Sequence, residues 1–234
     1  MTSKLKSVVV GAGEIGRAIH ALLEPHYPAF IYDVIPERKF TVESVDFLHI
    51  CFPYGPTFAS EVERYRAMFK PRCTIVHSTV PPGTCDGLGV VHSPVRGKHY
   101  DMLKSLRAYT KFFGGEDADW AADLFLRIGV PVHVYPVAYT TELAKVFETS
   151  FLGLLIRWSQ AVDEACKEYG LSYTEVWDKF VGTYNEKAES MGQPKFPVLV
   201  PIHEKIGGHC VLPNLEFLPH GFPFTDILWG KDHG

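Results

Sequence analysis

The clearest chemical pattern in the sequence is a glycine-rich run near its start, Gly11-Ala12-Gly13-Glu14-Ile15-Gly16, whose spacing is G-x-G-x-x-G. Gly11 permits a tight turn, Gly13 lets a diphosphate approach the backbone, and Gly16 allows a helix to lie close to a strand. The N–H groups at the start of that helix stabilise a bound anion. The run therefore predicts a dinucleotide site, and the alternative is a glycine turn in an α/β protein that binds no ligand.

An acidic residue follows this run at the distance expected for a ribose ligand. Asp33 lies 17 residues after Gly16, at the end of the next apolar segment. Its carboxylate would accept hydrogen bonds from the adenine ribose and repel a 2′-phosphate, so we predict NAD rather than NADP as the cofactor. Arg38 argues mildly for the opposite choice. We also place Pro53 and Thr79, which follow the third and fourth apolar segments, at the cofactor.

Short apolar segments that alternate with helical ones must position these residues. Six segments have the length and composition of strands: 5–10, 29–32, 46–52, 73–77, 88–92 and 130–135. Apolar residues at helical spacing predict helices over 14–23, 58–69 and 118–128. Such alternation is typical of a parallel sheet covered on both faces. The sequence thus predicts an α/β fold with a Rossmann-type, mostly parallel sheet.

The pattern changes near residue 137, where a long helical segment begins. Thr140 or Thr141 is expected to cap this helix, which should end at Gly170. A helix of about 30 residues is roughly 45 Å long. Its apolar stripe is wide for one small domain to cover, so we expect a homodimer that forms through this helix.

A second helix and an irregular segment are expected beyond the long helix. Ser172 and Glu175 have capping-box spacing, and the helix that they start should end near Met191. Prolines and aromatic residues dominate from residue 193 onward. We therefore divide the chain into an NAD-binding Rossmann domain over 1–136, a helical domain over 137–192 and an irregular C-terminal segment over 193–234.

Composition and charge restrict the partners of the chain. The 234 residues are 46% hydrophobic and have a formal net charge of −4, which does not favour nucleic acids or anionic membranes. No apolar run approaches the length of a membrane span, and the first residues do not resemble a signal peptide. The five cysteines are scattered and the histidines lack ligand spacing, so we expect neither disulfides nor a metal site. We therefore expect a cytoplasmic protein.

Four further segments follow one another along the chain: Ser78-Thr79-Val80-Pro81-Pro82-Gly83-Thr84, His92-Ser93-Pro94, Glu142-Leu143-Ala144-Lys145-Val146-Phe147 and Gly207-Gly208-His209-Cys210. Together with the glycine run, and in this order, they resemble the UDP-glucose/GDP-mannose dehydrogenase family. The resemblance implies an enzyme that oxidises an alcohol of a nucleotide sugar twice, to the acid, and reduces two NAD.

The resemblance assigns chemistry to individual residues. Cys210 would attack an aldehyde as a thiolate, and Lys145 would stabilise the alkoxide that develops on the sugar. Thr79 would bind a water molecule or the cofactor, while Thr149 and Asn214 occupy further catalytic positions of the family. The alternatives are a buried apolar cysteine, an exposed lysine and ordinary turn chemistry at Thr79.

The sequence departs from the family at three of its catalytic positions. Val95 stands where the family has a glutamate after Ser-Pro, Thr149 where it has an asparagine, and Asn214 where it has an aspartate. None of these side chains takes a proton as a carboxylate does, so hydrolysis of a thioester is the step most affected. Glu204 is a candidate replacement. We also expect the family's C-terminal Rossmann-like domain to be missing, because the sequence ends soon after Asn214.

Three functions therefore stay open. The first is an NAD-dependent dehydrogenase that oxidises a small molecule, a sugar or nucleotide sugar, through Cys210 and Lys145. The second is a non-catalytic NAD-binding protein, a sensor or assembly subunit derived from the same family. The third is a dehydrogenase that stops at the aldehyde or oxidises another substrate, with Lys145 as its main catalytic group.

Overall fold

The computed structural model describes residues 5–35, 44–97, 101–201 and 211–225. The chain divides into two compact units, residues 1–145 and 146–234. The first unit contains the sheet, and the second contains most of the long helix and the segments that follow it. In the described part of the chain, no helix combines the length and the apolar character needed to cross a membrane.

The first unit is built on one seven-stranded sheet with the strand order β2-β1-β3-β4-β5-β6-β7. All neighbouring strands pair in parallel except β5 and β6, which are antiparallel. This arrangement confirms the predicted Rossmann-like, mostly parallel sheet. The strands span Ser7–Val10 (β1), Ala29–Tyr32 (β2), Phe47–Ile50 (β3), Cys73–Val76 (β4), Val91–His92 (β5), Lys111–Gly114 (β6) and Val132–Tyr135 (β7).

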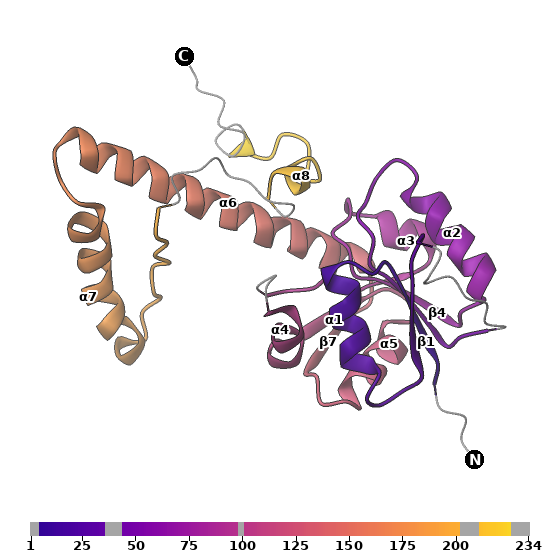
Figure 1. The fold of residues 1–234 in the computed structure, drawn as a ribbon. Coiled ribbons are helices and arrows are strands. Elements are labelled where there is room, and N and C mark those ends of the chain that lie inside the picture. Colours follow the sequence, from indigo (N-terminus) through magenta and orange to yellow (C-terminus); the bar gives the residue numbers. More distant parts are fainter. Residues whose placement is uncertain (1–4, 36–43, 98–100, 202–210, 226–234) are drawn as a thin grey trace. The chain divides into compact units, whose positions relative to one another are not determined.

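Helices cover both faces of this sheet (Figure 1). They span Glu14–Leu23 (α1), Phe58–Phe69 (α2), Thr84–Leu88 (α3), Met102–Ala108 (α4) and Ala118–Leu126 (α5). Successive residues of β1 enter different cores: Val9 joins the core that includes α1, α4 and α5, whereas Val8 and Val10 join the core that includes α2 and α3. Because both faces are covered, β1, β3 and β4 are buried along their whole length.

Three elements differ from the sequence prediction. The strand predicted over 88–92 is shorter, because Thr84–Leu88 forms α3 and only Val91 and His92 pair with β4. The sequence does not predict α4, whose seven residues are too few for a clear helical period. Nor does it predict β6, where Lys111 precedes two phenylalanines and no alternation of apolar and polar residues is visible.

The predicted long helix is confirmed as α6, which spans Ala138–Glu168 and has 31 residues. It begins in the first unit and continues into the second. The expected cap by Thr140 or Thr141 is wrong. The first N–H groups of the helix, those of Ala138 and Tyr139, donate to the Asp86 carboxylate instead.

After α6, the second unit contains a π-helix over Thr174–Asp178, α7 over Lys179–Ala188, a 3₁₀ turn over Glu189–Met191 and α8 over Leu212–Leu215. In this described segment no side chain caps the π-helix, so the predicted capping box is absent. Ser172 instead accepts the N–H groups of Glu175 and Val176 with its backbone carbonyl oxygen. Residues 193–201 contain neither helix nor strand. The predicted three-part division of the chain stays a prediction.

Candidate functional site

The glycine-rich run lies where the strand order of the sheet reverses. β1 has β2 on one side and β3 on the other, so the connections that leave the carboxyl ends of β1 and β3 go to opposite sides. Open α/β sheets bind ligands in the crevice at such a reversal, outside the carboxyl ends of the strands. Gly11 directly follows β1 and Cys51 directly follows β3, so the run stands at this position.

The three motif glycines have different structural roles. Gly11 has φ +100°, and a Cβ there would lie 3.1 Å from the carbonyl carbon and oxygen of Cys51. A Cβ on Gly16 would lie only 1.8 Å from the carbonyl oxygen of Gly11. A Cβ on Gly13 would meet nothing within 4 Å. The fold therefore requires Gly11 and Gly16, whereas Gly13 borders free space.

The amino end of α1 is available to an anion. Gly13 is the N-cap residue, and no side chain in the described part of the chain caps the helix there. The first N–H groups of an α-helix have no partner within the helix, and they attract negative charge. With the free space beside Gly13, this arrangement suits a diphosphate. Glu14 and Ile15, the first residues of the helix, lie at this end as predicted from the motif.

Asp33 lies beside the glycine run. One of its carboxylate oxygens accepts the Ala12 N–H at 2.5 Å, and the other accepts the Val34 N–H at 2.7 Å. The run is thus hydrogen-bonded to the residue that follows β2. Arg17, which sequence reasoning missed, donates from Nε to the Ala12 carbonyl oxygen at 2.7 Å. Its position directly after the glycine motif could have indicated this residue from the sequence. Arg38 lies outside the described residues.

Pro53 and Thr79 stand on the connections that leave β3 and β4, at the same edge of the sheet as the glycine run. A hydrogen bond joins these two connections, because the Ser78 hydroxyl donates to the Phe52 carbonyl oxygen at 2.5 Å. The structure therefore brings the predicted cofactor positions to one edge. Whether they bind a cofactor stays a prediction.

The segment that contains Thr79 is fixed to the first turns of α6. The carboxylate of Glu142, which is fully buried, accepts the N–H groups of Gly83 at 2.6 Å and Cys85 at 2.7 Å. Burial raises the pKa of this carboxyl group, and the two backbone donors act against that rise. In return, Asp86 accepts the N–H groups that begin α6.

His92 forms a further link in its neutral state. Its Nε2 lies 3.2 Å from the Ser78 carbonyl oxygen. Its Nδ1 lies 2.8 Å from the Thr141 hydroxyl oxygen, and this hydroxyl donates to the Ala138 carbonyl oxygen at 2.9 Å. Burial lowers the pKa of His92 to about 3, which keeps the ring neutral.

The predicted catalytic residues are not all placed. Lys145, partly buried, follows Glu142 by one helical turn at the end of the first unit. Thr149 and Asn214 belong to the second unit, where both are buried and the Thr149 hydroxyl donates to the Val146 carbonyl oxygen at 3.0 Å. Cys210 lies outside the described residues. The catalytic set therefore stays a prediction.

A buried basic cluster lies near the same strand ends and was missed by sequence reasoning. It consists of His49, His77 and Lys111. His49 donates from Nδ1 to His77 Nε2 at 3.0 Å, and His77 donates from Nδ1 to the Ser93 carbonyl oxygen at 2.8 Å. The Lys111 ammonium or amine donates to the same oxygen at 3.0 Å. Burial lowers the pKa of Lys111 to about 7 and that of His49 to about 3.

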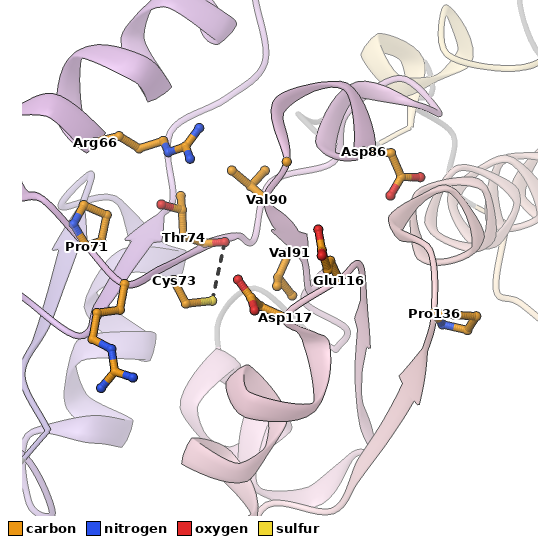
Figure 2. Close-up of a pocket in the computed structure, with 12 residues that line it drawn as sticks. Arg66, Pro71, Cys73, Thr74, Asp86, Val90, Val91, Glu116, Asp117 and Pro136 are labelled. Atoms are coloured by element: carbon orange, nitrogen blue, oxygen red, sulfur yellow. Dashed lines mark hydrogen bonds between the residues drawn. The ribbon is translucent and has the colours of Figure 1, made fainter.

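One cavity of the first unit is a separate feature. It has a volume of about 230 Å³, and Figure 2 shows Cys73, Thr74, Glu116 and Asp117 among the side chains that line it. Cys73 and Thr74 begin β4, so the cavity lies at the amino end of that strand, whereas the glycine run follows the carboxyl end of β1. The cavity is therefore distinct from the candidate dinucleotide crevice, which we place by topology and hydrogen bonding.

Comparison with known proteins identifies relatives of the fold. No protein-family model matches the sequence, and no curated protein matches it significantly. The structure is similar to UDP-D-ManNAc dehydrogenase from Pyrococcus horikoshii, with a TM-score of 0.77 and 18% identity over 96% of this chain and 66% of that one. It is also similar to UDP-glucose dehydrogenase from Pyrobaculum islandicum, with a TM-score of 0.62 and 19% identity over 82% of this chain and 66% of that one.

A more distant similarity is to a reductive aminase from Aspergillus terreus in complex with NADPH4, cyclohexanone and allyl amine. Its TM-score is 0.55 and its identity 14%, over 81% of this chain and 75% of that one. The predicted structural resemblance to UDP-sugar dehydrogenases is thus confirmed, over most of this chain. The chain spans 66% of the length of the two dehydrogenases.

Proposed function

We propose that the chain binds NAD at the glycine-rich run and uses it to oxidise an alcohol of a sugar-like substrate. The observation that supports cofactor binding is the free space at Gly13, on an uncapped helix end at the reversal of the strand order. When bound, NAD would accept a hydride from the substrate. The Asp33 carboxylate beside the run favours NAD over NADP, because it would repel a 2′-phosphate.

Two glycine variants test cofactor binding by calorimetry. Gly13→Val places a side chain in the free space, and the φ of −67° at this position suits a valine. We expect it to weaken NAD binding at least tenfold while the fold is kept. Gly182→Val is the matched control, because Gly182 also borders free space but lies on α7. Undiminished NAD binding by Gly13→Val would refute the proposed site.

For the reaction, we propose that Lys145 stabilises the developing alkoxide and that Cys210 attacks the aldehyde. A panel of nucleotide sugars and simple sugars, monitored by NADH absorbance, tests turnover. Cys210→Ala should stop the reaction at the aldehyde, whereas Lys145→Ala should abolish NADH formation. An acid product from Cys210→Ala would contradict the role of the cysteine.

A non-catalytic NAD-binding protein is the second candidate, and Val95 favours it. This residue stands where the resemblance predicts a glutamate, and it packs against the apolar core of the sheet. That position therefore offers no carboxylate to activate water. This candidate predicts NAD binding without NADH formation from any sugar of the panel, and turnover that Lys145→Ala abolishes would exclude it.

We also propose that two copies associate through α6. Phe151, Leu152 and Trp158 on this helix are 56%, 43% and 54% exposed. Several large apolar side chains exposed on one helix are typical of an interaction surface. Light scattering should give the mass of a dimer, and Phe151→Lys should reduce it to that of a monomer. Glu164→Lys, on an exposed position of the same helix, is the control. A monomeric wild-type protein would exclude this assembly.

A further inference from the structure

Two acidic side chains exchange helix caps between α3 and α6. Glu142 of α6 accepts the N–H groups of Gly83 and Cys85 at the start of α3, and Asp86 of α3 accepts those of Ala138 and Tyr139 at the start of α6. The four distances lie between 2.6 and 2.9 Å. Hydrogen bonds from backbone donors to a carboxylate are stronger than those between neutral groups. Each helix is thus capped by the other.

α3 depends on this exchange for its position. It has five residues, which is far below the length at which a helix is stable alone. Its N-cap residue Gly83 has no side chain and a φ of +92°. Glu142 is fully buried and accepts at both of its oxygens, so it is committed to these two N–H groups.

A third link joins the same two segments. The His92 ring forms hydrogen bonds with the Ser78 carbonyl oxygen, at the start of the loop that leads into α3, and with the Thr141 hydroxyl on α6. The loop between Ser78 and Thr84 is therefore held at its start by His92 and at its end by Glu142. Thr79 lies within this loop, and Lys145 follows Glu142 on α6 by three residues, on a neighbouring part of the helix surface.

We propose that Glu142 and Asp86 act together as positioning residues that set Thr79 relative to Lys145. Neither carboxylate touches the substrate in this proposal, because both are occupied by backbone N–H groups. The proposal rests on the function proposed above. It predicts that loss of either carboxylate loosens both helix starts, since each cap holds the element that supplies the other.

Hydrogen exchange followed by mass spectrometry tests the linkage without any turnover. Glu142→Gln keeps the shape of the side chain but removes its charge and one acceptor, and Asp86→Asn does the same at the other cap. We expect each variant to speed exchange at least tenfold at Gly83, Cys85, Ala138 and Tyr139. Glu164→Gln, on an exposed part of α6, should leave these rates unchanged. Faster exchange at only the adjacent helix start would overturn the linkage.

Turnover tests the positioning role. We expect Glu142→Gln and Asp86→Asn each to lower kcat at least tenfold and to change NAD affinity much less, because the glycine run is not altered. The double variant should lose little more than either single one. Normal kcat despite faster exchange would overturn the positioning role. If wild-type protein binds NAD but forms no NADH, the proposed catalysis fails, and the exchange rates alone then uphold or reject the linked caps.

Discussion

Replacement of Lys111 by methionine should stabilise the first unit and remove a pH dependence of its stability. Lys111 is 4% exposed, and its Nζ lies 5.6 and 5.4 Å from the ring centres of Phe113 and Phe125. Among the described residues, it donates to the backbone carbonyl oxygens of Ser93 and Pro94 rather than to a carboxylate. A charged ammonium is therefore poorly compensated in this place.

The magnitude follows from the pKa of the lysine. Burial lowers it from 10.5 to about 7, a difference of 10.5 − 7 = 3.5. At about 1.4 kcal/mol for each pKa unit, the difference corresponds to roughly 5 kcal/mol. Between the two values the unfolded chain holds a proton that the folded chain has lost, so the free energy of unfolding rises with pH over this window. Below about pH 7 both states are protonated, and the full burial penalty is present.

Other buried groups limit the pH range in which the change in stability reports on Lys111. Burial raises the pKa of Cys51 and Cys73 from 9.0 to about 12, so the folded chain keeps thiol protons that the unfolded chain loses, and stability falls above pH 9. Buried histidines act only below their unfolded value of 6.5. Between about pH 7 and 8.5, Lys111 alone should raise the wild-type free energy of unfolding by about 1.5 kcal/mol.

Thermal melting followed by circular dichroism at several pH values checks this expectation. Lys111→Met should raise the Tm at pH 7 by roughly 10 °C, from the usual relation between free energy and Tm in chains of this size. The Ser93 carbonyl oxygen keeps its bond from His77 in the variant. Lys104→Met, at a position 82% exposed on α4, is the control and should not change the Tm. A lower Tm for Lys111→Met, or wild-type stability that falls between about pH 7 and 8.5, would refute the reasoning.

Three further predictions concern the same unit. Gly16→Ala should abolish the folded state or lower the Tm by many degrees, as circular dichroism would detect, because its Cβ would lie 1.8 Å from the Gly11 carbonyl oxygen. Asp33→Asn should reduce NAD affinity at least tenfold and narrow its preference over NADP in calorimetry, and an unchanged preference would exclude a ribose contact. His49→Phe should lessen the loss of stability below pH 6.5, because the folded pKa of about 3 keeps His49 neutral while the unfolded chain takes up a proton. Equal acid sensitivity of variant and wild type would contradict this assignment.

The glycine run was predictable because its requirements are local. The spacing of Gly11, Gly13 and Gly16 indicates both the tight turn and the close approach of helix and strand. In the structure each of these glycines has a distinct environment. The helix α1 and the strand β2 likewise have the bounds expected from their apolar periods. These features depend on residues a few positions apart.

The helix starts were not predictable in the same way, because their partners are distant in sequence. Asp86 caps α6 from 52 residues away, and Glu142 binds Cys85 across 57 residues. Thr141, a good capping residue by type, instead bonds His92 of the neighbouring strand. The buried Lys111 was missed for a related reason: a charged residue ordinarily indicates surface, and only the assembled sheet shows that it is enclosed.

The one antiparallel pairing in the sheet, between β5 and β6, has a consequence for how the protein tolerates change. Because β6 and β7 are antiparallel to the other strands, the loops that follow them emerge at the edge of the sheet opposite the glycine run. These loops include Gly115, Glu116 and Pro136. We expect changes in the loop after β6 to leave the backbone around Gly11 in place. The loop after β7 is more constrained, because Ala138, two residues beyond Pro136, donates its N–H to Asp86.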